Sequence, residues 1–280
     1  MEDLVKTGKI LIFIVGLVGL AIAGTLFYNA TSNKTTQRGR VVIFDGTSSA
    51  GKSSVIKELI PSFDSSYKVI AVDDFVTDVF LEQKTLNLPE KDFIERVNQS
   101  VDGMYDTIRS LVGQGKTIFL DTVLAGLEGE KSVTYQLEKL KGLTLVMILI
   151  YCPLRTLIER IALRNAKALQ EKRPGDERSF GLPLKQFGSM YRRKVHNYEI
   201  SLGTLSRQDA DYALEASKKE FAGNTEQFNS FKEWFLSQLD LHDKQEVVLT
   251  ARLKYDCIVN TGIYSPQEGA QYIKENCAVL

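Results

Sequence analysis

The chain has 280 residues, of which 44% are hydrophobic and 25% are charged, the composition of an ordinary globular protein. Lys+Arg and Asp+Glu both number 35, so the formal net charge is zero and the concentrated positive charge of a nucleic-acid-binding surface is missing. We therefore expect one large domain, or one domain with an appendage, and no nucleic-acid partner.

The first candidate element is an uncharged apolar run, residues 10–28. As a helix it would be about 28 Å long, close to the ~30 Å thickness of a bilayer core. We expect one transmembrane helix, and the open alternatives are a cleaved signal peptide and a buried helix. The flanking basic residues weakly favour a single-pass membrane protein whose following domain faces the cytosol. They are Lys6 and Lys9 before the run, and Lys34, Arg38 and Arg40 after it.

The polar stretch that follows, residues 29–39, is typical of a linker. We therefore divide the chain into a membrane anchor with its linker, residues 1–39, and a folded domain, residues 40–280. Within that domain, short apolar runs alternate with segments of helical spacing. The expected strands are 41–45, 67–72, 117–121, 143–151 and 257–260, and the expected helices are 53–59, 90–112, 153–169 and 266–276. Such units predict a three-layer α/β fold with a five-stranded parallel sheet covered by helices on both faces.

One region, about residues 170–252, does not follow this alternation. It is charged and helix-like, and Phe228, Phe231 and Phe235 recur at helical spacing around Trp234. An aromatic stripe of this kind is typical of a packing face. We expect a helical insertion that packs on the core and forms an enlarged lid over the ligand crevice.

The most specific motif is GTSSAGKS, residues 46–53, which matches G-x-x-x-x-G-K-[ST]. The glycines let several backbone N–H groups converge on one phosphate, and the following helix adds its positive N-terminal end. Lys52 is expected to reach the outer phosphates of ATP, and the Ser53 hydroxyl to bind Mg²⁺. The expected phosphate-binding residues are Gly46, Thr47, Ser48, Ser49, Ala50, Gly51, Lys52, Ser53 and Ser54.

Acidic residues follow two of the expected strands. Asp121 ends the third strand, where an acid holds Mg²⁺ in this kind of fold, although it could instead cap a helix. Asp73 and Asp74 follow the second strand, at the sheet edge where open α/β sheets bind ligands. We expect Asp73 to accept a proton from a substrate hydroxyl and Asp74 to cap a helix starting near Phe75. The alternative is that both residues are caps.

Arginines on the expected helix 153–169 form a further candidate group. Arg160 and Arg164 are four residues apart and so share a helix face, with Arg155 on the same helix. Guanidinium groups can stabilise the charge of a phosphoryl group in transfer, so we expect Arg160 and Arg164 to be catalytic. A solvated basic face is the alternative.

Five segments occur in a characteristic order: GTSSAGKS after VVIFD, IAVDDF, GKTIFLDTVL, YCPLRTLIERIALR and YDCIVNTG. Together they resemble the chloramphenicol phosphotransferase-like branch of the P-loop kinases, over roughly residues 41–167 and 255–276. The zeta-toxin-like kinases look similar. The resemblance implies an ATP-dependent kinase acting on a hydroxyl of a small organic molecule. It implies Asp73 as the base, Asp121 as the third-strand acid, and Arg160 and Arg164 as lid arginines.

Two other functions remain open at this point. The protein could be a nucleotide hydrolase or switch in which Asp73 positions water, or a membrane-tethered protein that binds nucleotide without transferring a phosphoryl group. The presence of Lys52, Ser53, Asp73 and Asp121 argues against a decayed site. We therefore expect a kinase that uses ATP and Mg²⁺, with a small-molecule hydroxyl as acceptor and the membrane as a partner through residues 10–28.

Overall fold

The computed structural model describes residues 39–63, 66–124, 130–171, 198–204, 206–239, 246–251 and 254–277. The chain divides into two units, Met1–Arg38 and Gly39–Leu280, and every described residue belongs to the second. The apolar run 10–28, expected to cross a membrane, lies outside the described residues. Of the helices that are described, none is long and apolar enough to span a bilayer.

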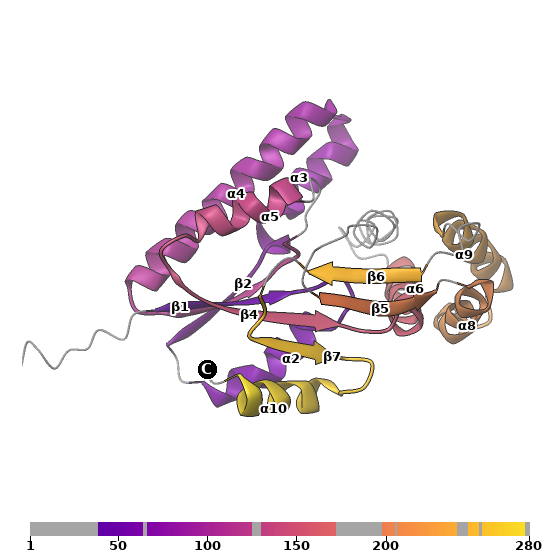
Figure 1. Ribbon diagram of the computed structural model, residues 1–280. Helices are drawn as coiled ribbons and strands as arrows, with labels where there is room; N and C mark the ends of the chain where they lie inside the picture. Colours follow the sequence, from indigo (N-terminus) through magenta and orange to yellow (C-terminus); the bar gives the residue numbers. More distant parts are fainter. Residues whose placement is uncertain are drawn as a thin grey trace, which may run out of the picture. The chain divides into compact units, whose positions relative to one another are not determined.

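A parallel sheet of five strands forms the centre of the second unit, in the spatial order β2-β3-β1-β4-β7 (Figure 1). The strands are β1 (Arg40–Asp45), β2 (Tyr67–Ala71), β3 (Thr117–Asp121), β4 (Thr144–Tyr151) and β7 (Cys257–Asn260). All four neighbouring pairs are parallel. The expected parallel sheet is therefore confirmed. Apolar runs predict such a sheet because its strands are buried on both faces.

Helices cover both faces of this sheet, as alternate residues of β1 show. Val41 and Ile43 pack with α4 (Glu90–Gly113) on one face. Val42 and Phe44 pack on the other face, against helices α2 (Lys52–Leu59) and α10 (Pro266–Asn276). Figure 1 shows α4 on one side of the strands and α2 and α10 on the other. The arrangement is the three-layer α/β fold that the sequence predicts.

The remaining helices of the core are α3 (Asp73–Leu86), α5 (Glu130–Lys139) and α6 (Leu154–Glu171), with a short 3₁₀ turn at Ile60–Ser62. The helix expected to start near Phe75 begins two residues earlier, at Asp73, because the capping residue Val72 already has helical angles (φ −59°, ψ −34°). Helix α5 was not expected at all. Its signal is present, since Val133, Leu137 and Leu140 have helical spacing.

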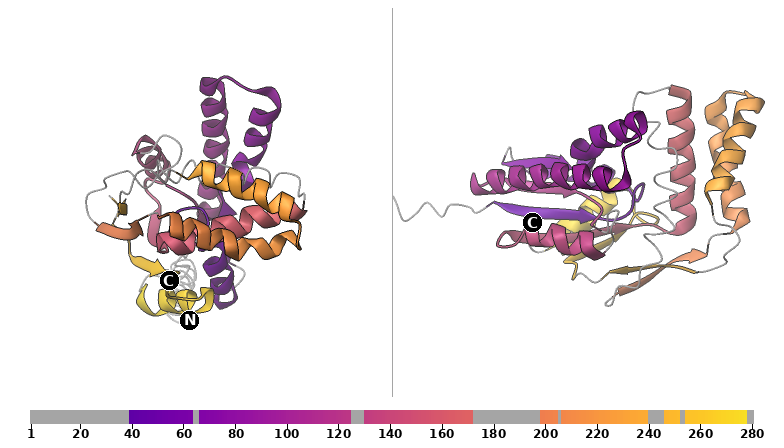
Figure 2. Two further views of the ribbon diagram at one scale, coloured as in Figure 1. Left: turned by 90° about the vertical axis from the view of Figure 1, so that its right-hand side faces the viewer. Right: turned by 90° about the horizontal axis from the view of Figure 1, so that it is seen from above.

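The region expected to be a helical insertion contains strands as well as helices. Helices α8 (Arg207–Ser217) and α9 (Thr225–Gln238), with a 3₁₀ turn at Lys218–Phe221, share a core with α6 (Figure 2). Phe231 and Phe235 lie in that core, so the aromatic stripe is a packing face. However, β5 (Tyr198–Thr204) and β6 (Glu246–Ala251) form a separate antiparallel pair. The strict polar–apolar alternation of YEISLGT is the strand signal that the helical interpretation overlooked.

Candidate active site

The loop between β1 and α2 has the geometry that binds phosphate. Gly46 has φ 149°, and a Cβ there would lie 2.0 Å from the carbonyl oxygen of Ile150 in the neighbouring strand. Gly51 has φ 100° and is the capping residue of α2. Only glycine fits both positions without strain, so the backbone can curl and direct its N–H groups inward at the N-terminus of a helix.

Lys52 lies inside this loop and is only 8% exposed. Its Nζ donates to the carbonyl oxygens of Gly46 at 3.0 Å and Thr47 at 3.1 Å, and lies 3.6 Å from Oδ1 of Asp121. The loop carbonyls and the acid therefore hold the ammonium group within the phosphate-binding loop. A triphosphate bound by the loop amides would meet a cation already in place.

The side chains of Ser53 and Asp121 meet beside this lysine. Ser53 Oγ donates to Oδ2 of Asp121 at 2.5 Å, and the Asp121 side chain is 13% exposed. The contact arises because β3 pairs with β1 and places Asp121 opposite Phe44, two residues before the loop begins at Gly46. A hydroxyl and a carboxylate that converge in this way fit Mg²⁺, which prefers oxygen ligands and takes few of them from protein.

Asp73 and Asp74 occupy the first turn of α3, and both residues are exposed. The turn is tied to the same sheet edge as Asp121, because the N–H of Val72 donates to the Asp121 carbonyl at 3.0 Å. The expectation that Asp74 caps α3 is wrong, since Val72 holds the capping position and no side chain caps the helix. Both carboxylates are therefore left for a favourable interaction with the helix dipole, or for substrate.

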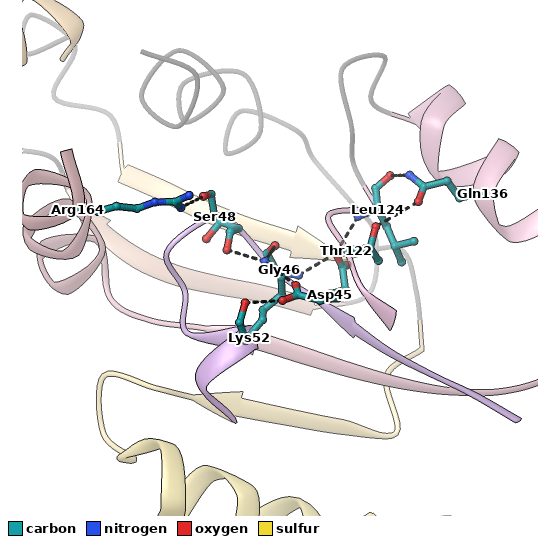
Figure 3. Close-up of polar contacts among 11 residues, drawn as sticks. Asp45, Gly46, Ser48, Lys52, Thr122, Leu124, Gln136 and Arg164 are labelled. Atoms are coloured by element: carbon teal, nitrogen blue, oxygen red, sulfur yellow. Dashed lines mark hydrogen bonds and ion pairs between the residues drawn. The ribbon is translucent and has the colours of Figure 1, made fainter. Parts of the chain in front are cut away.

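The two expected lid arginines, both on α6, have different surroundings. Arg160 donates to the carbonyl oxygen of Ala50 at 3.1 Å, and to the hydroxyl and the carbonyl oxygen of Thr261 at 2.9 and 2.8 Å. It therefore braces the phosphate-binding loop against the segment that follows β7. Arg164 is exposed, and its guanidinium donates to Ser48 Oγ at 3.2 Å (Figure 3). Arg164 is thus the arginine placed over the outer side of the loop.

Replacing Arg160 with alanine should weaken both the fold and ATP binding. A partly buried charged donor with three oxygen acceptors would be lost, and such hydrogen bonds contribute about 1.5–3 kcal/mol each. We expect a lower thermal midpoint and weaker ATP binding, measured by calorimetry on the same preparation. Arg164→Ala should leave the midpoint unchanged and slow phosphoryl transfer more than it weakens ATP binding.

The matched control for these variants is Arg155→Ala on the same helix. Arg155 lies 4.0 Å from Asp209 and stacks 4.0 Å above the Tyr212 ring, both on α8. Because these contacts do not involve the phosphate-binding loop, Arg155→Ala should leave ATP affinity unchanged. If Arg160→Ala binds ATP as tightly as the parent does, the bracing role assigned to Arg160 is wrong.

Three residues at this site escaped the sequence reasoning. Asp45, Tyr255 and Thr261 contact the phosphate-binding loop or its neighbours from β1, from the segment before β7 and from the segment after it. Thr261 donates to the Ala50 carbonyl oxygen, on which Arg160 also acts. The segment YDCIVNTG contains two of the three, but nothing in its pattern marks the hydroxyl groups as neighbours of the loop.

Solved structures with detectable similarity are distant from this chain in sequence. A candidate kinase from Chloroflexus aurantiacus is 11% identical, with 85% of this chain and 96% of that one covered at a TM-score of 0.42. Thymidylate kinase from Candida albicans is 15% identical, with 85% and 90% covered at a TM-score of 0.40. A protein of a chromosomal toxin–antitoxin system of Streptococcus pneumoniae is 15% identical, with 79% and 95% covered at a TM-score of 0.37. No curated protein matches the chain.

A family model does match, over residues 39–219, which is more than half of the chain. Its description is chloramphenicol phosphotransferase-like protein. The family expected from the motifs is therefore confirmed. The expected extent was wrong, because the match continues past residue 167 into the insertion, through β5 and α8. It ends at residue 219, before the second part of the expected resemblance, residues 255–276. With this match, the parallel sheet and the phosphate-binding loop in place, the chain belongs to the chloramphenicol phosphotransferase-like family of P-loop kinases.

Proposed function

We propose that this kinase transfers the γ-phosphoryl group of ATP to a hydroxyl of a small organic molecule. The observation that carries the proposal is the contact of Lys52 and Ser53, at the end of the phosphate-binding loop, with Asp121 at the end of β3. Asp73 begins α3 at the same edge of the sheet. This combination offers a place for the triphosphate and a carboxylate for an acceptor.

In this mechanism, the loop amides and the N-terminus of α2 bind the phosphate chain, and Lys52 neutralises charge on its outer oxygens. Ser53 and Asp121 would hold Mg²⁺, which would supply further positive charge to the phosphates. The acceptor oxygen forms a bond to the γ-phosphorus, the bond from that phosphorus to the bridging oxygen breaks, and ADP leaves. Asp73 accepts the proton of the acceptor hydroxyl, and Arg164 stabilises the charge of the moving phosphoryl group.

The dependence of ATP consumption on an acceptor tests this function. The purified chain is incubated with ATP and Mg²⁺, with and without an extract of small metabolites. A kinase should consume ATP slowly alone and much faster with the extract, because its transition state needs the acceptor hydroxyl. A nucleotide hydrolase or switch would consume ATP at the same rate in both incubations, and that result would overturn the proposal.

We also propose that residues 10–28 anchor the kinase domain to a membrane with the domain facing the cytosol. Support comes from the length and apolar character of that run and from the basic residues on its two sides. The side assignment also follows from the substrate, since ATP is a cytosolic nucleotide. Protease added outside intact cells should then leave the domain uncut. It should cut the domain only after the membrane that encloses the cytosol has been opened.

Removal of the anchor should release a soluble and active domain. The truncated chain should begin at Gly39 rather than at residue 40. Gly39 is buried, and even a Cβ added there would lie 2.2 Å from the Lys116 carbonyl oxygen. We expect the full chain in the membrane fraction, and the chain of residues 39–280 in the soluble fraction with unchanged MgATP affinity. A full chain that fractionates with soluble protein would contradict the anchor.

A further inference from the structure

Asp45, the last residue of β1, is a buried carboxylate that the proposed mechanism does not use; it is 9% exposed. Its Oδ1 accepts hydrogen bonds from the backbone N–H of Gly46 at 2.8 Å and of Leu124 at 3.0 Å. Its Oδ2 accepts the hydroxyl of Tyr255 at 2.6 Å. Figure 3 shows Asp45 between the start of the phosphate-binding loop and the segment after β3.

A buried carboxylate is costly unless hydrogen bonds replace its water. Here all three donors are uncharged, and two of them are backbone N–H groups whose positions depend on the path of the chain. The third donor is secure, because burial and then the negative charge of Asp45 raise the pKa of the Tyr255 hydroxyl far above its usual range. The carboxylate is therefore satisfied only while both backbone segments keep their present positions.

Both segments adjoin the residues assigned to the nucleotide site. Gly46 opens the phosphate-binding loop, and its carbonyl oxygen accepts the ammonium of Lys52. Leu124 lies shortly after Asp121, the acid that accepts from Ser53. We propose that Asp45 is a positioning residue whose carboxylate ties the phosphate-binding loop to the segment after β3, so that Lys52 and Asp121 keep a fixed separation.

The far side of the segment after β3 is held by a second set of buried contacts. Gln136 Nε2 donates to the Leu124 carbonyl oxygen at 3.0 Å, and Gln136 Oε1 accepts the Tyr105 hydroxyl at 2.7 Å. Thr122 Oγ1 lies 3.4 Å from the same Oε1 (Figure 3). Gln136 on α5, itself bonded to Tyr105 on α4, holds the carbonyl oxygen of Leu124, and Asp45 holds its N–H. Ligand binding at the loop should therefore also slow hydrogen exchange of the amides after β3.

The test uses the full chain, MgATP and amide hydrogen exchange, and it rests on the proposed nucleotide site. In the parent, MgATP should slow exchange both in residues 46–54 and in residues 121–124. Asp45→Ala should weaken MgATP binding by about tenfold or more, since hydrogen bonds to a charged group are lost. At saturating MgATP it should keep the protection of residues 46–54 and lose that of residues 121–124. Asp45→Asn should bind within about threefold of the parent, because an amide can still accept both backbone N–H groups.

Tyr105→Phe is the matched control, because it removes a buried hydroxyl at the far end of the same contacts without touching Asp45. It should lower Tm by about 2–4 °C and leave MgATP affinity and both protection patterns unchanged. A lower Tm for Asp45→Ala with parental affinity and protection would overturn the proposal, as would a loss of affinity in Asp45→Asn as large as that in Asp45→Ala.

Two further results have a definite meaning. If Asp45→Ala does not fold, Asp45→Ser takes its place, since serine keeps a polar group but is too short to reach Leu124. Failure of both variants to fold would overturn the positioning role and make Asp45 a residue of stability alone. If the folded parent itself does not bind MgATP, the proposed function fails, which is a different result from a parent that binds MgATP with no dependence on Asp45.

Discussion

Replacing Lys52 with alanine should abolish phosphoryl transfer and leave the domain folded. The Lys52 ammonium contacts two loop carbonyls and Asp121, and none of these contacts belongs to the apolar core. Charge on the outer phosphates grows as the phosphoryl group moves, and removing one positioned stabilising group typically slows catalysis by about 10²–10³-fold. We therefore expect at least that loss, measured as product formation with ATP, Mg²⁺ and an active metabolite extract.

The control for this variant is Lys57→Ala. Lys57 is exposed in the last turn of the same helix, α2, so its loss removes a positive charge without affecting the loop. That variant should keep parental activity, and the far-ultraviolet circular dichroism of both variants should match the parent. Full transfer activity in Lys52→Ala would show that residues 46–53 do not bind the triphosphate in the assigned way.

Replacing Asp73 with asparagine should slow transfer by about 10²–10⁴-fold while ATP affinity stays within a few-fold of the parent. Asparagine keeps the size of the side chain and one acceptor oxygen, but it cannot take the proton of an acceptor hydroxyl. The exposed position in the first turn of α3 means that the substitution leaves no buried group without a partner. Transfer and ATP binding are measured separately, by product formation and by calorimetry.

Asp74→Asn is the matched control, because Asp74 lies in the same helical turn and is equally exposed. It should cost only the helix-dipole interaction, about 0.3–1 kcal/mol of stability, with little change in rate. If Asp74→Asn transfers slowly and Asp73→Asn transfers at the parental rate, Asp74 is the base and the assignment to Asp73 is wrong. If both variants transfer at the parental rate, neither carboxylate of α3 acts as the base.

The parts of this molecule that could be predicted from the sequence are those determined by local pattern. Most core strands are continuous apolar runs, and the phosphate-binding loop is a contiguous motif between a strand and a helix. The antiparallel pair of β5 and β6 is different, because two helices separate its strands along the chain. The alternation of YEISLGT marks β5 as a strand, but its pairing with β6 over such a distance has no local signature. The charged helices between the strands favoured an all-helical interpretation.

The candidate site shows the same division. Lys52, Ser53 and Asp121 could be selected because the motif and the strand end imply their chemistry. Asp45 looked like the ordinary polar end of a strand, since its partners Leu124 and Tyr255 come from segments 79 and 210 residues further along the chain. The helical spacing of Arg160 and Arg164 likewise placed both on one face, without showing that Arg160 contacts the phosphate-binding loop and Thr261, which follows β7.

The destination of the γ-phosphoryl group tests the central claim most directly. The full chain is incubated with ATP labelled in the γ-phosphate, Mg²⁺ and a small-metabolite extract, and the labelled products are separated and identified by mass spectrometry. We expect the label in a phosphate ester of an organic hydroxyl compound, formed by the parent and absent with Lys52→Ala. Label found only as inorganic phosphate, released by the parent at the same rate with or without the extract, would contradict a kinase of this kind.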